Sequence, residues 1–166
     1  MKLIVCLENN NGVIFNKRRV SSDKKVTKKI IELTQGKKLW ISYYTQELFV
    51  DKDIKSTLIV ISNSIFKKAG ESDYVFVENI MPENLDDCSE LIIFRWNRDY
   101  PSDLKFDFDF SDSFELSSAK IIKGNSHDEI TEEHYTRKKW GVKNEKEQKV
   151  FTDNKYNRCN IVCRPV

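Results

Sequence analysis

Short runs of branched apolar residues alternate with polar, helix-like stretches along the first 95 residues of the chain. Residues 3–7 are continuously apolar and are followed by Glu8 and three Asn, the pattern of a strand that is buried on both faces and ends in a turn. Similar apolar runs predict strands at 38–42, 56–62, 73–78 and 90–95. Strands of this kind alternating with helices predict an α/β fold with a predominantly parallel sheet covered by short helices.

One long helix is predicted over residues 23–35. Val26, Ile30 and Leu33 recur there at helical spacing, lysines fill the opposite face, and Gly36 can end the helix. Ser21, Ser22 and Asp23 precede it and are all residue types that cap helix N-termini. Shorter helices are predicted at 45–49 and 82–87.

From residue 106 onward the hydrophobic pattern is less regular. Phe and Asp alternate over 106–110, which indicates a strand or extended arm with one wet face, and 114–122 is a further strand candidate. The polar stretch 124–139 is expected to be loop or short helix, and 149–152 with 159–163 are expected to close the fold as an antiparallel hairpin at one edge. The length of 166 residues suits one domain over 1–166.

Taken in order, several segments resemble dihydrofolate reductase. Residues 3–14 are similar to that family's first strand and following loop, and 42–47 (SYYTQE) to its G-R-x-T-x-E segment. Residues 90–100 are similar to an apolar strand leading into G-G-x-x-x-Y, and 114–117 with 124–127 to a late strand and its G-D-T-x-F turn. The resemblance implies a dihydrofolate reductase-like mixed sheet with an antiparallel C-terminal hairpin, NADPH as cofactor and a pterin-like substrate.

Several positions that would face the cofactor differ from the family pattern. Arg95 and Trp96 stand at the match to the Gly pair, whose lack of side chains lets a backbone approach phosphate. Tyr43 replaces the phosphate-binding Arg, and basic residues replace the Pro-Trp after the first loop. We therefore expect the NADPH signature to be degraded and both large side chains to obstruct the phosphate site.

Asp23 is the candidate acid–base residue. The resemblance places it where the family carries a single carboxylate, at the start of the first long helix, which hydrogen-bonds the pterin and supports its protonation. A half-buried carboxylate of this kind can shift its pKa and serve acid–base chemistry. The alternative is that Asp23 only caps the helix and interacts with its dipole.

The candidate ligand-binding residues come from two sources. Residues 95–100 (RWNRDY) end the strand at 90–95 and should lie at a carboxyl end of the sheet. Their aromatic and guanidinium groups could stack there on a base and clamp a phosphate. Alternatively the Trp packs on the core and the Arg residues pair with nearby carboxylates. The resemblance adds positions in the first strand, the G-R-x-T match and the late strand. Together these are Cys6, Thr45, Arg95, Trp96, Arg98, Tyr100 and Ser117.

Basic residues gather near the N-terminus, although 28 Lys+Arg against 26 Asp+Glu leave a net charge of only +2. Such a balance does not indicate a dedicated nucleic-acid binder. The local cluster could still touch phosphates of RNA or of a nucleotide, or it could be the solvated face of a helix. Its members are Lys17, Arg18, Arg19, Lys24 and Lys28.

No metal site is expected. The four cysteines form no C-x-x-C pair. His127 and His134 would share a face if they lay on one helix, but they lack spaced partners. A fainter resemblance, in the opening residues and in R-W-N-R-x-Y-P at 95–101, is to short bacterial proteins labelled ribonuclease Z. That nuclease needs an H-x-H-x-D-H zinc motif, which this chain does not contain.

Two functions are consistent with these features. The first is a non-catalytic nucleotide- or RNA-binding module that keeps the reductase fold. The second is an NADPH-dependent reductase acting on a pterin or a related small heterocycle. The initial apolar run is too short for a signal peptide and nothing approaches the roughly 20 apolar residues of a membrane span, so we expect a cytoplasmic protein. The oligomeric state is left open.

Overall fold

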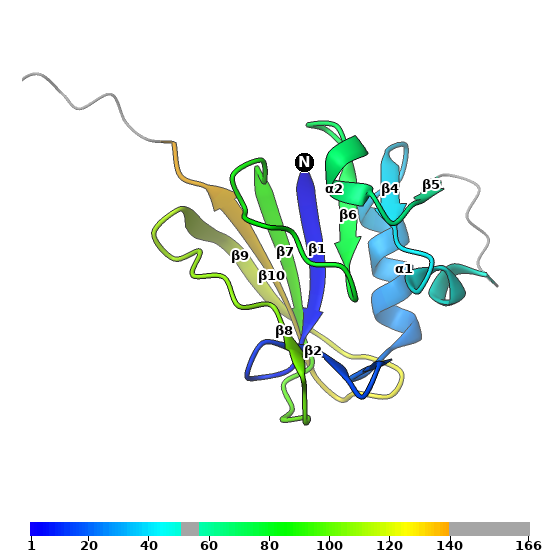
Figure 1. Cartoon of the computed structure of the whole chain (residues 1–166). Coiled ribbons are helices and arrows are strands. Elements are labelled where there is room, and N and C mark those ends of the chain that lie inside the picture. Colours follow the sequence, from blue (N-terminus) through cyan, green and yellow to red (C-terminus); the bar gives the residue numbers. More distant parts are fainter. Residues whose placement is uncertain (51–56, 140–166) are drawn as a thin grey trace, which may run out of the picture.

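A computed structural model describes residues 1–50 and 57–139 (Figure 1). A seven-stranded sheet has the order β5-β4-β6-β1-β7-β10-β9, and a small second sheet has the order β3-β2-β8. The elements are β1 Lys2–Leu7, β2 Gly12–Phe15, β3 Arg18–Arg19, α1 Lys24–Leu33, β4 Lys38–Ile41, the 3-10 helix η1 Thr45–Phe49, β5 Leu58–Ile61, α2 Ile65–Lys68, β6 Tyr74–Val77, β7 Glu90–Arg95, β8 Leu104–Lys105, β9 Phe114–Ile122 and β10 Ile130–Arg137.

The centre of the large sheet is parallel, as the apolar runs predict. β1 lies between β6 and β7 and is parallel to both, with Val5 paired with Val77 on one side and with Ile93 on the other. β4 is parallel to β6 and β5. β10 and β9 add an antiparallel pair beyond β7. The predominantly parallel mixed sheet is therefore confirmed.

Alternate residues of the central strands enter two separate cores, one on each face of the sheet. Leu3 and Val5 pack with the face covered by α2. Ile4 packs with Val26 and Ile30 of α1, on the face that α1 and η1 cover (Figure 1). Burial on both faces explains why these strands are continuously apolar rather than alternating.

Two segments differ from the sequence-based expectations. Residues 82–87 form turns and not a helix, and 130–137 form the strand β10 where loop or short helix was expected. The antiparallel pair at the edge is made by β9 and β10. The segments 149–152 and 159–163, which were expected to form it, lie outside the described residues.

Candidate functional site

The candidate site lies at the carboxyl ends of β1 and β6, beneath the start of α1, where open parallel sheets bind ligands. Cys6 of β1, Glu78 after β6, Trp96 after β7 and Asp23 before α1 line a shared cavity there. The cavity measures about 20 Å³, which is room for about one water molecule, whereas ligand pockets commonly span about 300 to 1,000 Å³. The cleft is thus nearly filled by the protein's own side chains.

A larger hollow of about 590 Å³ lies around Met1, Phe66 and Arg137, at the amino ends of β1 and β7. The Arg137 guanidinium that lines this hollow donates to the main-chain oxygen of Cys88 at 2.7 Å, so it already has a hydrogen-bond partner within the protein. We place the candidate site at the carboxyl ends because buried polar groups from distant parts of the chain converge there.

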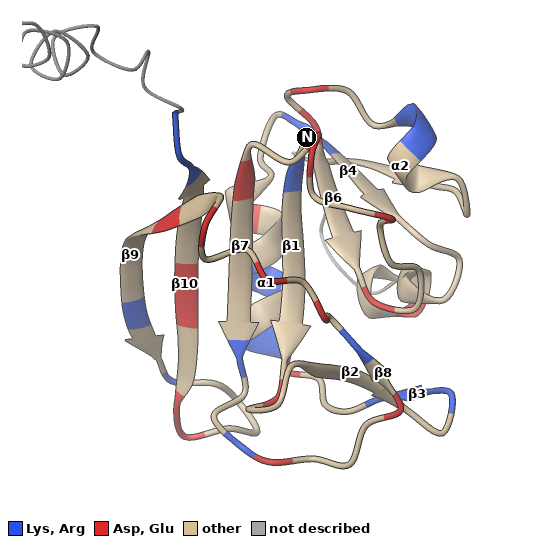
Figure 2. Cartoon of the chain, turned by 60° about the vertical axis from the view of Figure 1, so that its left-hand side comes forward, with Lys and Arg blue, Asp and Glu red and all other residues tan. Residues whose placement is uncertain are grey.

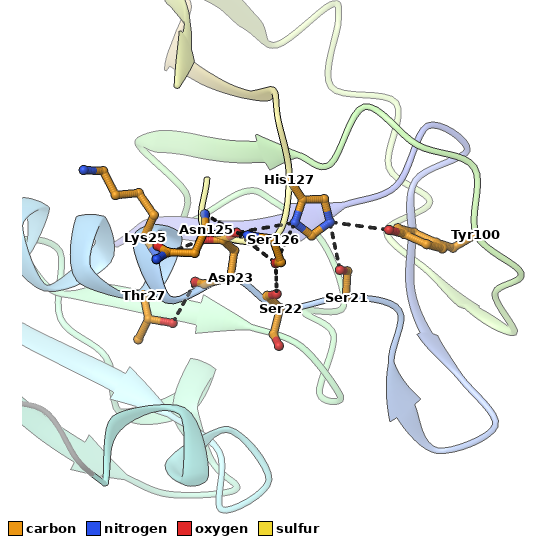
Figure 3. A network of polar contacts seen from close by, with 9 residues as sticks. All are labelled: Ser21, Ser22, Asp23, Lys25, Thr27, Tyr100, Asn125, Ser126 and His127. Atoms are coloured by element: carbon orange, nitrogen blue, oxygen red, sulfur yellow. Dashed lines mark hydrogen bonds and ion pairs between the residues drawn. The ribbon is translucent and has the colours of Figure 1, made fainter. Parts of the chain in front are cut away.

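Asp23 is the N-cap of α1, and its carboxylate is fully occupied by the protein (Figure 3). Oδ1 accepts the Lys25 amide at 2.7 Å. Oδ2 accepts the amides of Asn125 at 2.8 Å and Ser126 at 2.7 Å, and the Ser126 hydroxyl at 3.0 Å. A Cβ on Gly124 would lie 2.6 Å from Oδ2, so this close approach of the 124–127 turn depends on glycine.

These hydrogen bonds decide the charge of Asp23. Burial alone would raise the pKa of its carboxyl group, but the amides of Ser126, Asn125 and Lys25 outweigh burial and hold the pKa well below its usual range. Asp23 is therefore a carboxylate at neutral pH and carries no proton that it could donate. The structure shows the capping interaction; a catalytic role stays a prediction.

His127 contacts residues from three separate segments around the site. Its ring stacks on Trp96 with centroids 4.8 Å apart and an interplanar angle of 27°. Nε2 lies 3.0 Å from Ser21 Oγ and 3.4 Å from the Tyr100 hydroxyl. Figure 3 shows the imidazole between these two hydroxyl groups on one side and Ser126 with Asp23 on the other.

Trp96 and Arg95 serve the interior and not a phosphate turn. Trp96 is 2% exposed, and its Nε1 has no hydrogen-bond partner among the described residues. The Arg95 guanidinium donates to Glu133 at 2.9 Å and to Asn11 at 3.1 Å. A loop connects β7 to β8, so these residues are not at a strand-to-helix turn of the kind that holds phosphate. Trp96 lines the cleft, and the expected obstruction of a phosphate site by Arg95 and Trp96 stays a prediction.

Glu78, which lines the cleft, forms an ion pair with Arg19. Arg19 Nε lies 3.0 Å from Glu78 Oε1, the same guanidinium contacts Glu47, and it stacks over the Tyr44 ring at 4.8 Å. Burial would lower the pKa of Arg19, but the bonds and charge of Glu78 outweigh burial and raise it, so the group is always charged. Arg19 therefore does not belong to a free basic surface.

The other members of the basic cluster are exposed, but they are split between two sets. Lys17 lies in the β2–β3 turn, Arg18 lies on β3, and Lys24 and Lys28 lie on α1 (Figure 2). Arg19, which follows Arg18 on β3, is paired with Glu78 and Glu47 and so does not extend the first set.

The remaining predicted ligand residues are dispersed. Cys6 lines the cleft, and burial raises the pKa of its thiol, so it is neutral there. Thr45 is buried, with its hydroxyl 3.0 Å from that of Ser42. Arg98 is exposed, and Ser117 lies on the edge strand β9, where it donates to the His134 carbonyl.

Sequence reasoning missed the pairing of Ser21 with His127. The histidine was read against His134 as one face of a helix, but it lies in the loop before β10, and His134 lies on that strand. Ser21 was read only as a capping residue. A separation of 106 positions along the chain leaves no spacing signal for their contact.

Two absences among the described residues bear on the class of site. Over 1–50 and 57–139, no three His, Cys, Asp or Glu side chains gather closely enough to hold a metal ion. Within the same ranges, no helix has the length and apolar character needed to cross a membrane.

Comparison with solved structures places the architecture. The structure of dihydrofolate reductase from Enterococcus faecalis, complexed with NADP(H) and RAB-propyl, matches with a TM-score of 0.58 at 14% sequence identity, over 83% of this chain and 97% of that chain. The chain has the dihydrofolate reductase fold. No protein-family model and no curated protein matches the sequence. At this identity the likeness concerns the fold alone, and the dihydrofolate reductase-like architecture inferred from weak collinear motifs is confirmed.

Replacing Asp23 by Asn should destabilise this dihydrofolate reductase-like fold by about 3 kcal/mol, because an amide NH₂ would face the donors of Asn125 and Ser126 and the charge-assisted bonds would be lost. Since the folded-state pKa of Asp23 is lowered, its stabilisation is present above the unfolded-state value of about 3.9 and is lost as the pH falls below it. Urea unfolding at about pH 7 and about pH 3 should therefore show a smaller difference between wild type and variant in acid.

Asp109→Asn is the matched control, since that exposed carboxylate bonds only to nearby Ser111. Its free energy of unfolding should stay close to wild type. Equal effects of the two substitutions would contradict the role assigned to Asp23.

Proposed function

We propose that this protein is a small-molecule-binding module that has kept the dihydrofolate reductase fold and lost the NADPH-dependent redox chemistry. One observation carries the proposal. Both oxygens of the Asp23 carboxylate, which the resemblance assigns to pterin binding, are engaged by the amides of Lys25, Asn125 and Ser126. A carboxylate whose two oxygens already accept hydrogen bonds from the protein is poorly suited to bind a pterin, and an ionised carboxylate has no proton to pass to it.

The ligand we propose is nucleotide-like, with a flat ring and an attached phosphate. Val26, Ile30, Leu48 and Phe76 give the cleft apolar walls suited to a ring. The buried Nε1–H of Trp96 has no partner among the described residues, and a ring nitrogen or carbonyl oxygen of a ligand would satisfy it.

Charge outside the cleft fits the phosphate of such a ligand. Lys24 is exposed in the first turn of α1, and Arg18 is exposed on β3. Either cation alone can pair with one phosphate group, whereas the long backbone of RNA needs a continuous basic surface. We therefore favour a nucleotide over RNA.

Binding requires the cleft to widen. Glu78, the ion-pair partner of Arg19, lines it, and the cavity holds about one water molecule. A ligand must therefore displace lining side chains, as expected where a conformational change accompanies binding.

A thermal-shift screen of the full chain tests the proposal, with purine and pyrimidine nucleoside monophosphates, NADPH, dihydrofolate and a short RNA as probes. We expect a nucleoside monophosphate to raise the midpoint and Trp96→Phe, which removes the N–H and keeps an aromatic ring, to reduce that shift. NADPH with dihydrofolate should give none. A shift with the latter pair alone would favour the reductase, and indifference to every nucleotide would overturn the binding proposal.

A further inference from the structure

A chain of polar contacts at the mouth of the cleft carries an inference beyond ligand binding. We propose that Ser21 is the nucleophile of an acyl-transfer site, with His127 as its general base and Asp23, through Ser126, as the group that orients the base. Ser21 Oγ lies 3.0 Å from His127 Nε2. His127 Nδ1 lies 3.1 Å from Ser126 Oγ and 3.5 Å from Asp23 Oδ2 (Figure 3).

The surroundings of the imidazole assign its proton. Nδ1 faces Ser126 Oγ, whose own hydrogen has two other acceptors, the Asp23 carboxylate at 3.0 Å and the Ser22 main-chain oxygen at 3.2 Å. Nδ1 therefore carries the proton and donates it, and Nε2 keeps its lone pair. That lone pair accepts the Ser21 hydroxyl, which is the arrangement of a serine activated by an oriented histidine.

The base is held rigidly while the nucleophile stays accessible. His127 is 5% exposed, stacked on Trp96, and Asp23 is 4% exposed. Ser21 is only half-buried and lines the cleft. A fixed base beside a reachable hydroxyl is what general-base catalysis needs geometrically.

The same cleft supplies a group for the negative charge that develops on a substrate carbonyl. Trp96 Nε1 is a buried donor without a partner among residues 1–50 and 57–139, and Trp96 lines the cavity together with Ser21. An unpaired N–H in a site shielded from water stabilises an oxyanion effectively. The apolar walls suit a short acyl group once the cleft widens from its present volume of about 20 Å³, so the substrate class is a short-chain carboxylic ester.

The reaction balances with water as its one co-reactant. Ser21 Oγ bonds to the ester carbonyl carbon while its proton passes to His127 Nε2. The bond from that carbon to the alkoxy oxygen then breaks, and the departing alcohol takes the proton from Nε2. Water next attacks the acyl-serine by the same proton route, releasing the carboxylic acid and regenerating Ser21.

Labelling of the full chain with a fluorophosphonate, read by intact mass and peptide mapping, tests this site, together with hydrolysis of p-nitrophenyl acetate. We expect one label, on Ser21, and a loss of about a hundredfold or more in rate for Ser21→Ala and His127→Gln. Trp96→Phe should also lower the rate of p-nitrophenyl acetate hydrolysis by about a hundredfold, because it removes the indole N–H that stabilises the oxyanion.

Ser22→Ala is the matched control. Ser22 is exposed, and among residues 1–50 and 57–139 it contacts the network only through its main-chain oxygen, which the substitution keeps, so the variant should be labelled and active like wild type. Ser21→Ala removes one hydroxyl group, and its thermal midpoint verifies that it is folded. An unlabelled wild type, or label and activity that persist in Ser21→Ala, would overturn the proposal. Nucleotide-induced thermal shifts are a separate readout, so this result and the binding result can fail independently.

Discussion

Replacing Trp96 by Ala is expected to lower the free energy of unfolding by about 4 kcal/mol, the middle of the range for deleting a buried aromatic side chain. Trp96 is among the largest fully buried side chains, packs in the core beneath α1 and stacks on His127. Its removal would leave a void under the cleft and free the imidazole ring. Chemical denaturation with fluorescence or circular dichroism measures the loss.

Trp96→Phe distinguishes the contribution of the aromatic ring from that of the indole N–H. Phe keeps most of the apolar contact and the stack, and it removes a buried donor that has no partner among the described residues. We expect a cost of less than about 1.5 kcal/mol, because the lost volume is offset by removal of the unsatisfied group. A loss of under about 1 kcal/mol for Trp96→Ala would show that this side chain does not hold the cleft closed.

Replacing Glu78 by Ala is expected to lower the free energy of unfolding by about 3 kcal/mol. The Glu78 side chain is 6% exposed and that of Arg19 is 16% exposed, so the pair is largely shielded from water. Removing one partner leaves the other charge buried without full compensation, which is far more costly than losing a surface pair. Glu47, at 68% exposure, compensates Arg19 only in part.

Two further variants make this prediction specific. The double variant Arg19→Met/Glu78→Leu should recover most of the loss, since apolar residues can replace a buried pair. Glu32→Gln removes an exposed pair with Lys29 at 3.8 Å and should cost no more than about 0.5 kcal/mol. Equal losses for Glu78→Ala and Glu32→Gln in urea titrations would contradict the assigned role of the ion pair.

The central fold was predictable because its signals are local. β7 was expected over 90–95 and is observed as Glu90–Arg95, since a strand buried on both faces must be continuously apolar. α1 was recognisable from helical spacing and from Asp23 as its cap. Neither signal needs knowledge of distant parts of the chain.

β10 was missed because its burial depends on partners. Ile130–Arg137 contains Thr, two Glu, His and Arg, a composition typical of a loop. Glu132 is nevertheless fully buried and contacts His134 and Lys120, and the strand is fixed by its register with Phe94 of β7. Pairing with a neighbouring strand overrides composition here.

Part of the site could be predicted from the sequence. Asp23, Cys6, Trp96 and Tyr100 were candidates, and the structure brings them to or near the cleft. The partnership of Ser21 and His127 arises only when the 124–127 turn folds over the start of α1. Contacts between distant loops leave no periodic pattern, so only coordinates reveal them.

The dihydrofolate reductase fold persists here, and we propose that it does so without that enzyme's redox chemistry. The most direct test follows the absorbance of NADPH on incubation with the full chain and dihydrofolate at neutral pH, with Asp23→Asn in parallel. We expect NADPH oxidation at the rate seen without protein. Steady, protein-dependent oxidation that Asp23→Asn abolishes would contradict the claim and establish Asp23 as part of a working reductase site.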